Sequence, residues 1–337
     1  MKSVLLQKRL FLFALTTLLL ALVPLPASAD TTVGGTISTD TTWAAADSPF
    51  IVTSNVTVQG ADGADGITTL TIEPGVVVKL NNSRYITIGA SSGNPGALSA
   101  VGTEADPITF TSNQATPAPG DWNYIRFYNT ADDATTVMEH CVVEYGGYSY
   151  GSLYVYQASP TFRNVTVQNS KTRGAYLYTT EPTIEDCTFS GNQDYDLYYT
   201  GTVGGTVTGT TINSGICLLA SGTVSFSGNT INQNNALPIK AYADNVGEIS
   251  ASTFTNVDTA SYLEVAGQTV SRDATWTAAI PYAITNNTTV KGTDGADGIT
   301  TLTLEPGAVV KLNSSRIIDI GASSGDPGAL SAVGTAA

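Results

Sequence analysis

Between residues 138 and 254, apolar and polar positions recur in short blocks along the chain. Each block is six residues long and broadly reads apolar, polar, polar, small, polar, apolar. Clear copies begin at Met138, Phe162 and Ile184, and weaker copies begin at Val207, Phe226 and Ile249. This alternation predicts short strands with one buried face.

A second strand pattern follows the blocks after a turn, at residues 153–156, 175–178, 197–199 and 239–242. Two or three short strands in a repeat of about two dozen residues are typical of one coil of a parallel β-helix, an all-β solenoid of stacked coils. The turns carry Asn169, Asn192, Asn213, Asn232 and Asn256. Asn tolerates left-handed backbone, so the sequence predicts a column of stacked Asn side chains at one corner.

A longer repeat frames these coils, because residues 50–103 return at 282–335 with most positions identical. We therefore divide the chain into an N-terminal module at 30–115, central coils at 116–268 and a second, truncated copy of the module at 269–337. The second copy stops just before the strand that follows the first. We expect the chain to be a fragment of a longer modular protein; a deliberately short terminus is the alternative.

Three segments give the chain a family resemblance: LTIEPGVVVKL (70–80), GALSAVGTEADPITFTS (96–112) and GDWNYIRFYNTADDATTVMEHCVVEYGG (120–147). They resemble exported bacterial right-handed parallel β-helix proteins of the pectate-lyase-like superfamily. The resemblance covers essentially the whole mature chain and implies that fold. It leaves the activity open, because the family includes polysaccharide lyases and hydrolases as well as surface or adhesive proteins.

The first 29 residues read as a secretory signal peptide. A basic start with Lys2, Lys8 and Arg9 precedes an apolar stretch at 11–23 and an A-x-A cleavage site that ends at Ala29. We expect the mature chain to be secreted or held at the cell surface. A membrane anchor is the competing interpretation, but the apolar stretch is short and is followed by prolines.

The formal net charge of −14 argues against nucleic acid and anionic membranes as partners, because binding phosphate needs clustered Lys and Arg. Such a surface suits a soluble exported protein or one that collects divalent cations. The oligomeric state is left open.

The chain has three cysteines, Cys141, Cys187 and Cys217. Cys141 and Cys187 occupy the same coil position two coils apart, at roughly 10 Å, which exceeds disulfide reach. We predict that they are buried, reduced core residues.

The strongest binding candidates are tyrosines in register. Tyr154, Tyr176 and Tyr198 align with one another, and Tyr156 aligns with Tyr178. Their rings should point outward and form a strip suited to stacking against sugar rings of a polysaccharide or surface glycan. The alternative is that the rings merely stabilise the sheet.

Aspartates separated by glycine are the candidate calcium ligands: Asp62 and Asp65, repeated as Asp294 and Asp297. Carboxylates in such a loop can bind Ca²⁺ together with backbone carbonyls. Asp-Gly is also an ordinary turn signal, so a plain turn is the alternative.

Other reactive residues are weaker candidates. Asp132 and Asp133 faintly resemble the acid pairs of β-helix hydrolases but lack their partners, so they favour a turn. Lys171 and Arg173 could supply the base of a lyase, but no acidic cluster adjoins them in sequence. The single histidine, His140, has no nucleophile motif nearby and reads as a solvent-facing residue.

From these features we predict an exported, non-catalytic adhesive or glycan-binding module with no catalytic residues assigned. A polysaccharide lyase or glycoside hydrolase, with acids assembled across coils, is one alternative. A structural spacer is another.

Overall fold

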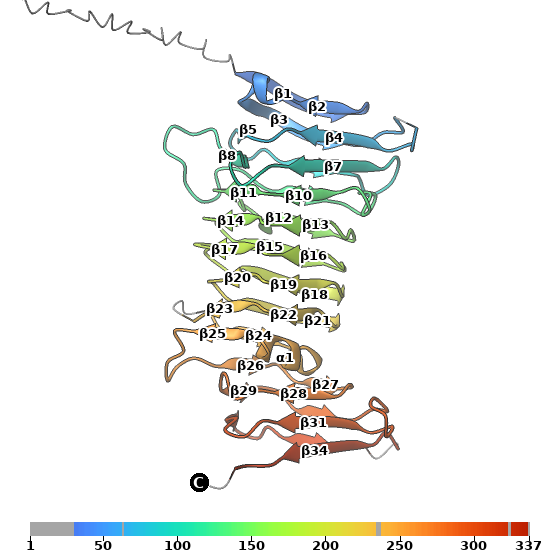
Figure 1. The fold of residues 1–337 in the computed structure, drawn as a ribbon, viewed down its shortest axis with the longest axis vertical. Coiled ribbons are helices and arrows are strands. Elements are labelled where there is room, and N and C mark those ends of the chain that lie inside the picture. The colour runs from blue at the N-terminus through green and yellow to red at the C-terminus, as the bar shows by residue number, and fades with distance from the viewer. Residues whose placement is uncertain (1–29, 63, 234–236, 323–324, 336–337) are drawn as a thin grey trace, which may run out of the picture.

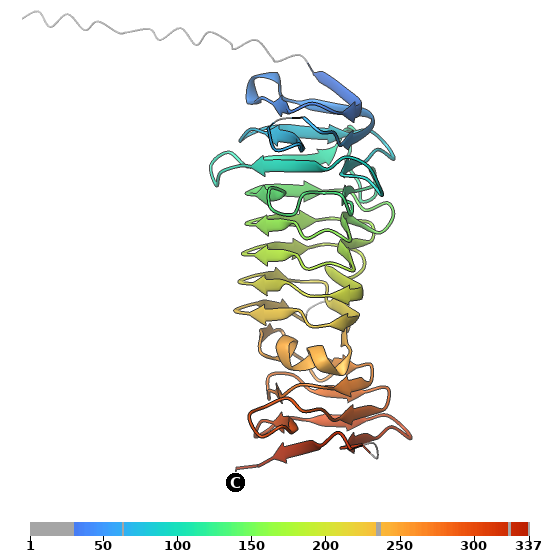
Figure 2. The same ribbon diagram turned by 90° about the vertical axis from the view of Figure 1, so that its right-hand side faces the viewer.

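The computed structural model describes residues 30–62, 64–233, 237–322 and 325–335. The predicted leader at 1–29 therefore lies outside the described residues. The chain winds into coils that stack in sequence order along one axis, from the blue N-terminal coil to the red C-terminal coil (Figure 1). A view from the side shows the same single column of coils (Figure 2). The predicted all-β solenoid is confirmed.

Three faces of parallel strands enclose the core in the described part of the chain. Face 1 contains β5 (Val77–Leu80), β8 (Ile108–Ser112), β11 (Cys141–Glu144), β14 (Thr166–Gln168), β17 (Thr188–Ser190), β20 (Thr211–Ile212), β23 (Thr230–Asn232) and β25 (Thr253–Thr255). Face 2 contains β6 (Ile86–Ile88), β9 (Ile125–Phe127), β12 (Gly151–Tyr156), β15 (Arg173–Tyr178), β18 (Leu197–Val203), β21 (Ile216–Gly222), β24 (Ile239–Ala241), β26 (Leu263–Val265), β29 (Tyr282–Ile284) and β32 (Val310–Leu312). Face 3 contains β2 (Thr41–Trp43), β4 (Thr68–Ile72), β7 (Gly96–Val101), β10 (Val137–Glu139), β13 (Thr161–Arg163), β16 (Thr183–Glu185), β19 (Thr206–Thr208) and β22 (Ser225–Ser227).

The N-terminal coils join two of these faces. Strands β1 (Thr31–Ile37) and β3 (Phe50–Val58) are long enough to run along both face 1 and face 2. A short 3₁₀ turn, η1 (Ala45–Asp47), lies between β2 and β3. The strand pairs of the described chain are parallel, and apart from a register shift between Val33 and Gly35 of β1 they are in register. Identical coil positions therefore stack directly above one another, about 4.8 Å apart.

The six-residue blocks are not single strands, as the sequence suggested, but two strands that meet at a corner. Met138, for example, lies in β10 and Val143 in β11, with His140 between them at a φ of 46°. Asn164 and Asp186 occupy the same corner at φ of 50° and 51°. Asn, Asp and His adopt left-handed backbone more readily than other non-glycine residues, so one such residue bends each of these three coils from face 3 to face 1. Gly209 and Gly228 make the same bend in the next two coils, at φ of 61° and 62°.

All three cysteines, Cys141, Cys187 and Cys217, are buried and free. Cys141 and Cys187 lie in the core, as predicted, whereas Cys217 belongs to the outer column of face 2, in register with Tyr198. Burial raises the pKa of the Cys141 and Cys187 thiols to about 12. Because thiolate is the reactive form, these thiols should be inert in the folded protein.

We expect a water-soluble thiol reagent to label none of the three cysteines at neutral pH until a denaturant is added. Burial and the raised pKa both oppose reaction. Labelling followed by mass spectrometry measures this, with the denatured chain as the control for full reactivity. Rapid labelling of Cys141 or Cys187 in the native protein would contradict the stacked core.

The predicted Asn column is present only in part, at the corner between faces 1 and 2. It contains Asn213, Asn232 and Asn256, whereas the Asn192 amide donates to Asp196 and the Asn169 side chain lies beside Gly191. The amide of Asn256 donates to the Asn232 oxygen at 2.8 Å, and the amide of Asn232 donates to the Asn213 oxygen at 3.1 Å. In the coil before Asn213, the buried carboxylate of Asp196 stabilises this corner. Asp196 accepts hydrogen bonds at 2.7 Å from the Asn192 amide and from the backbone N–H groups of Asn213 and Ser214.

A helix interrupts face 3 at a place where the sequence predicted a strand block. Helix α1 (Ala243–Ser250) contains Ile249, which the pattern had placed at the start of a strand, and the strand β25 follows it. Val246 and Ile249 are fully buried, so the helix supplies the core residues that a strand would supply. In Figure 1, α1 lies between β22 and β28.

Beyond α1 the second copy of the module stacks in a rotated position. Tyr282 begins β29 and corresponds to Phe50, which pairs with β5 of face 1, yet β29 pairs with β26 of face 2. Two further three-stranded sheets complete this part: β27 (Gln268–Val270), β30 (Thr288–Val290) and β33 (Ile318–Ile320), and β28 (Ala274–Trp276), β31 (Thr300–Leu304) and β34 (Gly328–Ala332).

The two copies bury the same residues differently. Leu80 and Ile88 are fully buried in the first copy, where β8 and β9 pair with their strands. Their counterparts Leu312 and Ile320 are 49% and 42% exposed. Burial of this sequence therefore depends on the coil stacked against it.

Candidate functional site

The predicted tyrosines lie in register on the outer side of face 2. Tyr154 pairs with Tyr176 and Tyr176 with Tyr198, while Tyr156 pairs with Tyr178. The alternate residues of these strands, such as Leu177, are fully buried and fill the core. Because side chains alternate across a strand, these tyrosines point away from the core, whereas Tyr199 of β18 points into it.

The rings form ladders along the stack. Tyr176 and Tyr198 are stacked with centroids 5.5 Å apart and planes 12° apart, and Tyr156 and Tyr178 are stacked at 5.0 Å and 11°. Tyr154 contacts Tyr176 edge to face at 5.3 Å and 74°. Both arrangements are favourable for aromatic pairs.

Other tyrosines, which the sequence analysis missed, enlarge this surface. Tyr128 stacks on Tyr156 at 4.9 Å, and Tyr85 stacks on Tyr124 at 5.3 Å. Aligning the strand at 125–128 with the one at 153–156 would have found Tyr128, whereas Tyr150 and Tyr195 lie in turns that the repeat pattern does not cover. We call the whole set the tyrosine face: Tyr85, Tyr124, Tyr128, Tyr150, Tyr154, Tyr156, Tyr176, Tyr178, Tyr195 and Tyr198.

Tyr150 covers one of the predicted rings. It lies flat against Tyr154, with centroids 4.5 Å apart and planes 13° apart, so Tyr154 is only 8% exposed. Tyr150 itself is 46% exposed and has a φ of 67°, which is rare for a bulky residue. The ring offered to solvent in this coil is therefore Tyr150 and not Tyr154.

Two arginines lie among the rings. The Arg126 guanidinium is 4.4 Å from the centroid of Tyr128 and 5.6 Å from that of Tyr124. The Arg173 guanidinium is 4.2 Å from the centroid of Tyr198 and pairs with Asp194 at 3.2 Å. Cations over aromatic faces are stabilised by the ring quadrupole.

Burial keeps four phenol groups of this surface in the neutral form. Burial raises the pKa of Tyr124, Tyr154 and Tyr176 above the ordinary value, and it raises the pKa of Tyr195 to about 12. Each protonated hydroxyl can both donate and accept a hydrogen bond. The face therefore combines flat apolar rings with neutral hydrogen-bonding groups.

Comparison with protein families agrees with this architecture. Residues 35–168 match the pectate-lyase like beta helix domain, and residues 151–294 match the right handed beta helix region. The chain belongs to the right-handed parallel β-helix proteins. The two matches together include every residue of the tyrosine face. No curated protein and no solved structure matches the chain, and the fold by itself does not name a ligand.

The candidate calcium ligands of this β-helix hold its turns in both copies. Asp62 and Asp294 each accept a hydrogen bond from the backbone N–H of an aspartate in the preceding coil, at 2.7 and 2.8 Å. Asp65 and Asp297 each accept one at 3.0 Å from the N–H two residues later. Among the described residues, no three His, Cys, Asp or Glu side chains gather into a group that could hold a metal ion. The calcium site stays a prediction.

The remaining reactive residues are dispersed. Asp132 accepts hydrogen bonds from Thr135, and Asp133 accepts one from the backbone N–H of Ser159. Lys171 lies at a corner with its amine 4.6 Å from the Tyr148 ring centroid. The structure brings Arg173 to the tyrosine face. The side-chain hydrogen bonds of Asp132 and Asp133 go to Thr135 and Ser159, away from Arg173.

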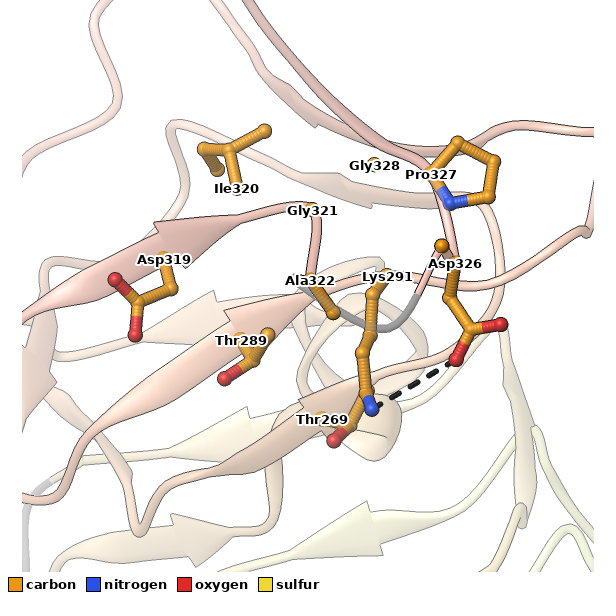
Figure 3. Close-up of a pocket in the computed structure, with 11 residues that line it drawn as sticks. Thr269, Thr289, Lys291, Asp319, Ile320, Gly321, Ala322, Asp326, Pro327 and Gly328 are labelled. Atoms are coloured by element: carbon orange, nitrogen blue, oxygen red, sulfur yellow. Dashed lines mark ion pairs between the residues drawn. The ribbon is translucent and has the colours of Figure 1, made fainter.

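A shallow cavity of about 890 Å³ lies outside β27, β30 and β33 (Figure 3). No residue of the tyrosine face lines it. Lys291 crosses it toward Asp326, at 3.8 Å. The first copy has the uncharged Gln59 and Asn94 at the corresponding positions, so the two copies differ in charge here.

An acidic cavity of about 460 Å³ lies between α1 and β28. Its carboxylates accept hydrogen bonds from backbone N–H groups of the adjoining turns and strands. They stabilise the junction between the helix and the second copy, and they belong to Asp244, Glu248, Asp273, Asp294 and Glu305.

No helix in the ranges that the structure describes is both long and apolar enough to span a membrane.

Proposed function

We propose that this β-helix is an exported, non-catalytic adhesive module that binds a polysaccharide or surface glycan on its tyrosine face. The observation that carries this proposal is the register of the rings. Stacking of Tyr176 on Tyr198 and of Tyr156 on Tyr178 holds these rings in fixed positions along the outer side of face 2.

Sugar rings and tyrosine rings are complementary in shape and chemistry. The C–H faces of a pyranose pack against an aromatic face, while its hydroxyl groups need hydrogen-bonding partners at the edge. The tyrosine face supplies both over five successive coils of face 2, from β6 to β18. At about 4.8 Å per coil this is a length of about 19 Å, enough for several sugar units.

Rigidity also favours binding over mere packing. The rings are fixed by their neighbours above and below, so a ligand would order few side chains on binding. An exported protein that meets long glycans benefits from such a pre-ordered surface. We propose further that the mature chain starts at Asp30 and has neither nucleic acid nor membrane as a partner.

The test is affinity electrophoresis of residues 30–337 in gels that contain neutral or acidic polysaccharides, with calcium or with a chelator. We expect retardation by at least one glycan, and we expect the Tyr176→Ala, Tyr198→Ala double variant to lose about tenfold or more in affinity, since two stacked rings are removed.

The control is Tyr262→Ala, which removes a tyrosine that is 38% exposed but lies outside the tyrosine face. It should bind as the unmodified chain does. Equal retardation of the double variant and the control would refute the role of the face. Shortening of the polysaccharide during the run would favour the lyase or hydrolase alternative.

A further inference from the structure

The outer column of face 2 changes its charge along the stack. Arg126 pairs with Tyr154, after which come Tyr176 and Tyr198. Beyond Tyr198 the column continues with Cys217, Lys240 and Glu264. Arg126 therefore lies at one end of the tyrosines in this column, and Lys240 lies beyond their other end.

Of the two cations in this column, only Arg126 lacks an acidic partner among the described residues. Lys240 pairs with Glu264 at 2.9 Å, and Arg173 pairs with Asp194 at 3.2 Å. In the described part of the chain the Arg126 side chain makes no ion pair. Its guanidinium makes one long hydrogen bond, to the Thr87 hydroxyl at 3.4 Å.

The Arg126 guanidinium is also partly withdrawn from water. Its Nε is buried without a hydrogen-bond partner, and three tyrosine rings surround the group at 4.4 to 5.9 Å. A half-buried cation without a partner is costly in a folded protein. An anionic group of a ligand would supply the missing partner, and a guanidinium binds carboxylate or sulfate with paired N–H donors.

The rest of the face disfavours further negative charge. The face of an aromatic ring is electronegative and does not attract anions. The cations near Tyr176 and Tyr198 are neutralised by Asp194 and Glu264, and Lys171 lies at the corner against the exposed Tyr148. The chain as a whole carries a net charge of −14, so a ligand with a charge on every sugar would be repelled.

We infer that the tyrosine face binds a sparsely charged glycan, in which one anionic group contacts Arg126 and uncharged sugar rings lie against Tyr176 and Tyr198. This inference rests on the glycan-binding function proposed above. Arg126 is then the residue that sets specificity, because it raises the affinity for a ligand with one negative charge at this end of the site. Tyr176 lies two coils from Arg126, so the uncharged rings begin within about 10 Å of the anion.

The probe is a polyuronate whose carboxyl groups are unesterified, partly methyl-esterified or fully methyl-esterified, at matched chain length. We expect affinity to be highest for the partly esterified polymer. Arg126→Gln should weaken binding to that polymer about tenfold or more, as expected for loss of a charge-assisted hydrogen bond, and should shift the maximum to the fully esterified form. A neutral glycan with sparse sulfate esters distinguishes sulfate from carboxylate as the anion.

The matched control is Arg316→Gln, which removes the same charge at an exposed position and should leave the order of affinities unchanged. Affinity that rises steadily to the unesterified polymer, or a wild-type maximum at full esterification, would overturn the inference. So would an Arg126→Gln variant that keeps the wild-type order. If binding requires Tyr176 and Tyr198 but not Arg126, the glycan-binding proposal is upheld and only the charge preference is refuted. If no polymer is bound by the unmodified chain, both fall.

Discussion

Phe162→Ala is expected to lower the free energy of unfolding by about 3–5 kcal/mol. Phe162 is 1% exposed and lies in the inner column of face 3, between Met138 and Ile184. Its ring meets that of Phe127 edge to face at 5.5 Å. Each coil contacts only its neighbours, so the cavity cannot be filled from elsewhere in the stack. Chemical unfolding followed by circular dichroism measures the change.

Two substitutions calibrate this result. Phe162→Leu keeps most of the buried volume and should cost clearly less than Phe162→Ala. Val101→Ala, at a position on face 3 that is 40% exposed, should change the free energy of unfolding by less than about 0.5 kcal/mol. If Phe162→Ala proved as mild as Val101→Ala, the assignment of Phe162 to the core would be wrong.

The second large effect concerns the buried carboxylate of Asp196. Burial raises the pKa of Asp196 to about 6 from an ordinary value of 3.8, although hydrogen bonds from Asn192, Asn213 and Ser214 oppose the rise. The folded state thus holds the proton more tightly than the unfolded state does. The stabilising contribution of Asp196 is complete below pH 3.8 and is lost as the pH rises through about 6. The shift corresponds to roughly 3 kcal/mol.

Asp196→Asn isolates this contribution because asparagine does not ionise. The Asn oxygen can still accept from the backbone N–H groups of Asn213 and Ser214, although the contact with the Asn192 amide is lost. We expect the difference in unfolding free energy between wild type and variant to shift by roughly 2 kcal/mol between pH 4 and pH 7, in favour of the variant at high pH. Parallel pH profiles for the two proteins would show that Asp196 does not titrate in this range.

The features that depend on repetition were predictable from the sequence. The coil period, the burial of Cys141 and Cys187 and the register of Tyr154 with Tyr176 all follow from positions that return in each coil. In a parallel stack the same position in successive coils has the same surroundings, so one correct alignment gives many contacts.

The features that break the repetition were not predictable in this way. Ile249 fits the strand block but lies in α1, because a helix can fill the same core volume as a strand. Tyr150 covers Tyr154 from a turn outside the pattern. The rotation of the second copy by one face depends on how β29 docks against β26. The repeated sequence does not itself indicate which strand of the preceding coil it will pair with.

The structure of this β-helix with the most strongly retained oligosaccharide bound tests the central claim most directly. The account predicts sugar rings packed against Tyr176 and Tyr198 on face 2, with the glycosidic bonds intact after long incubation. A ligand bound in the acidic cavity beside α1, or a cleaved product on any face, would contradict it.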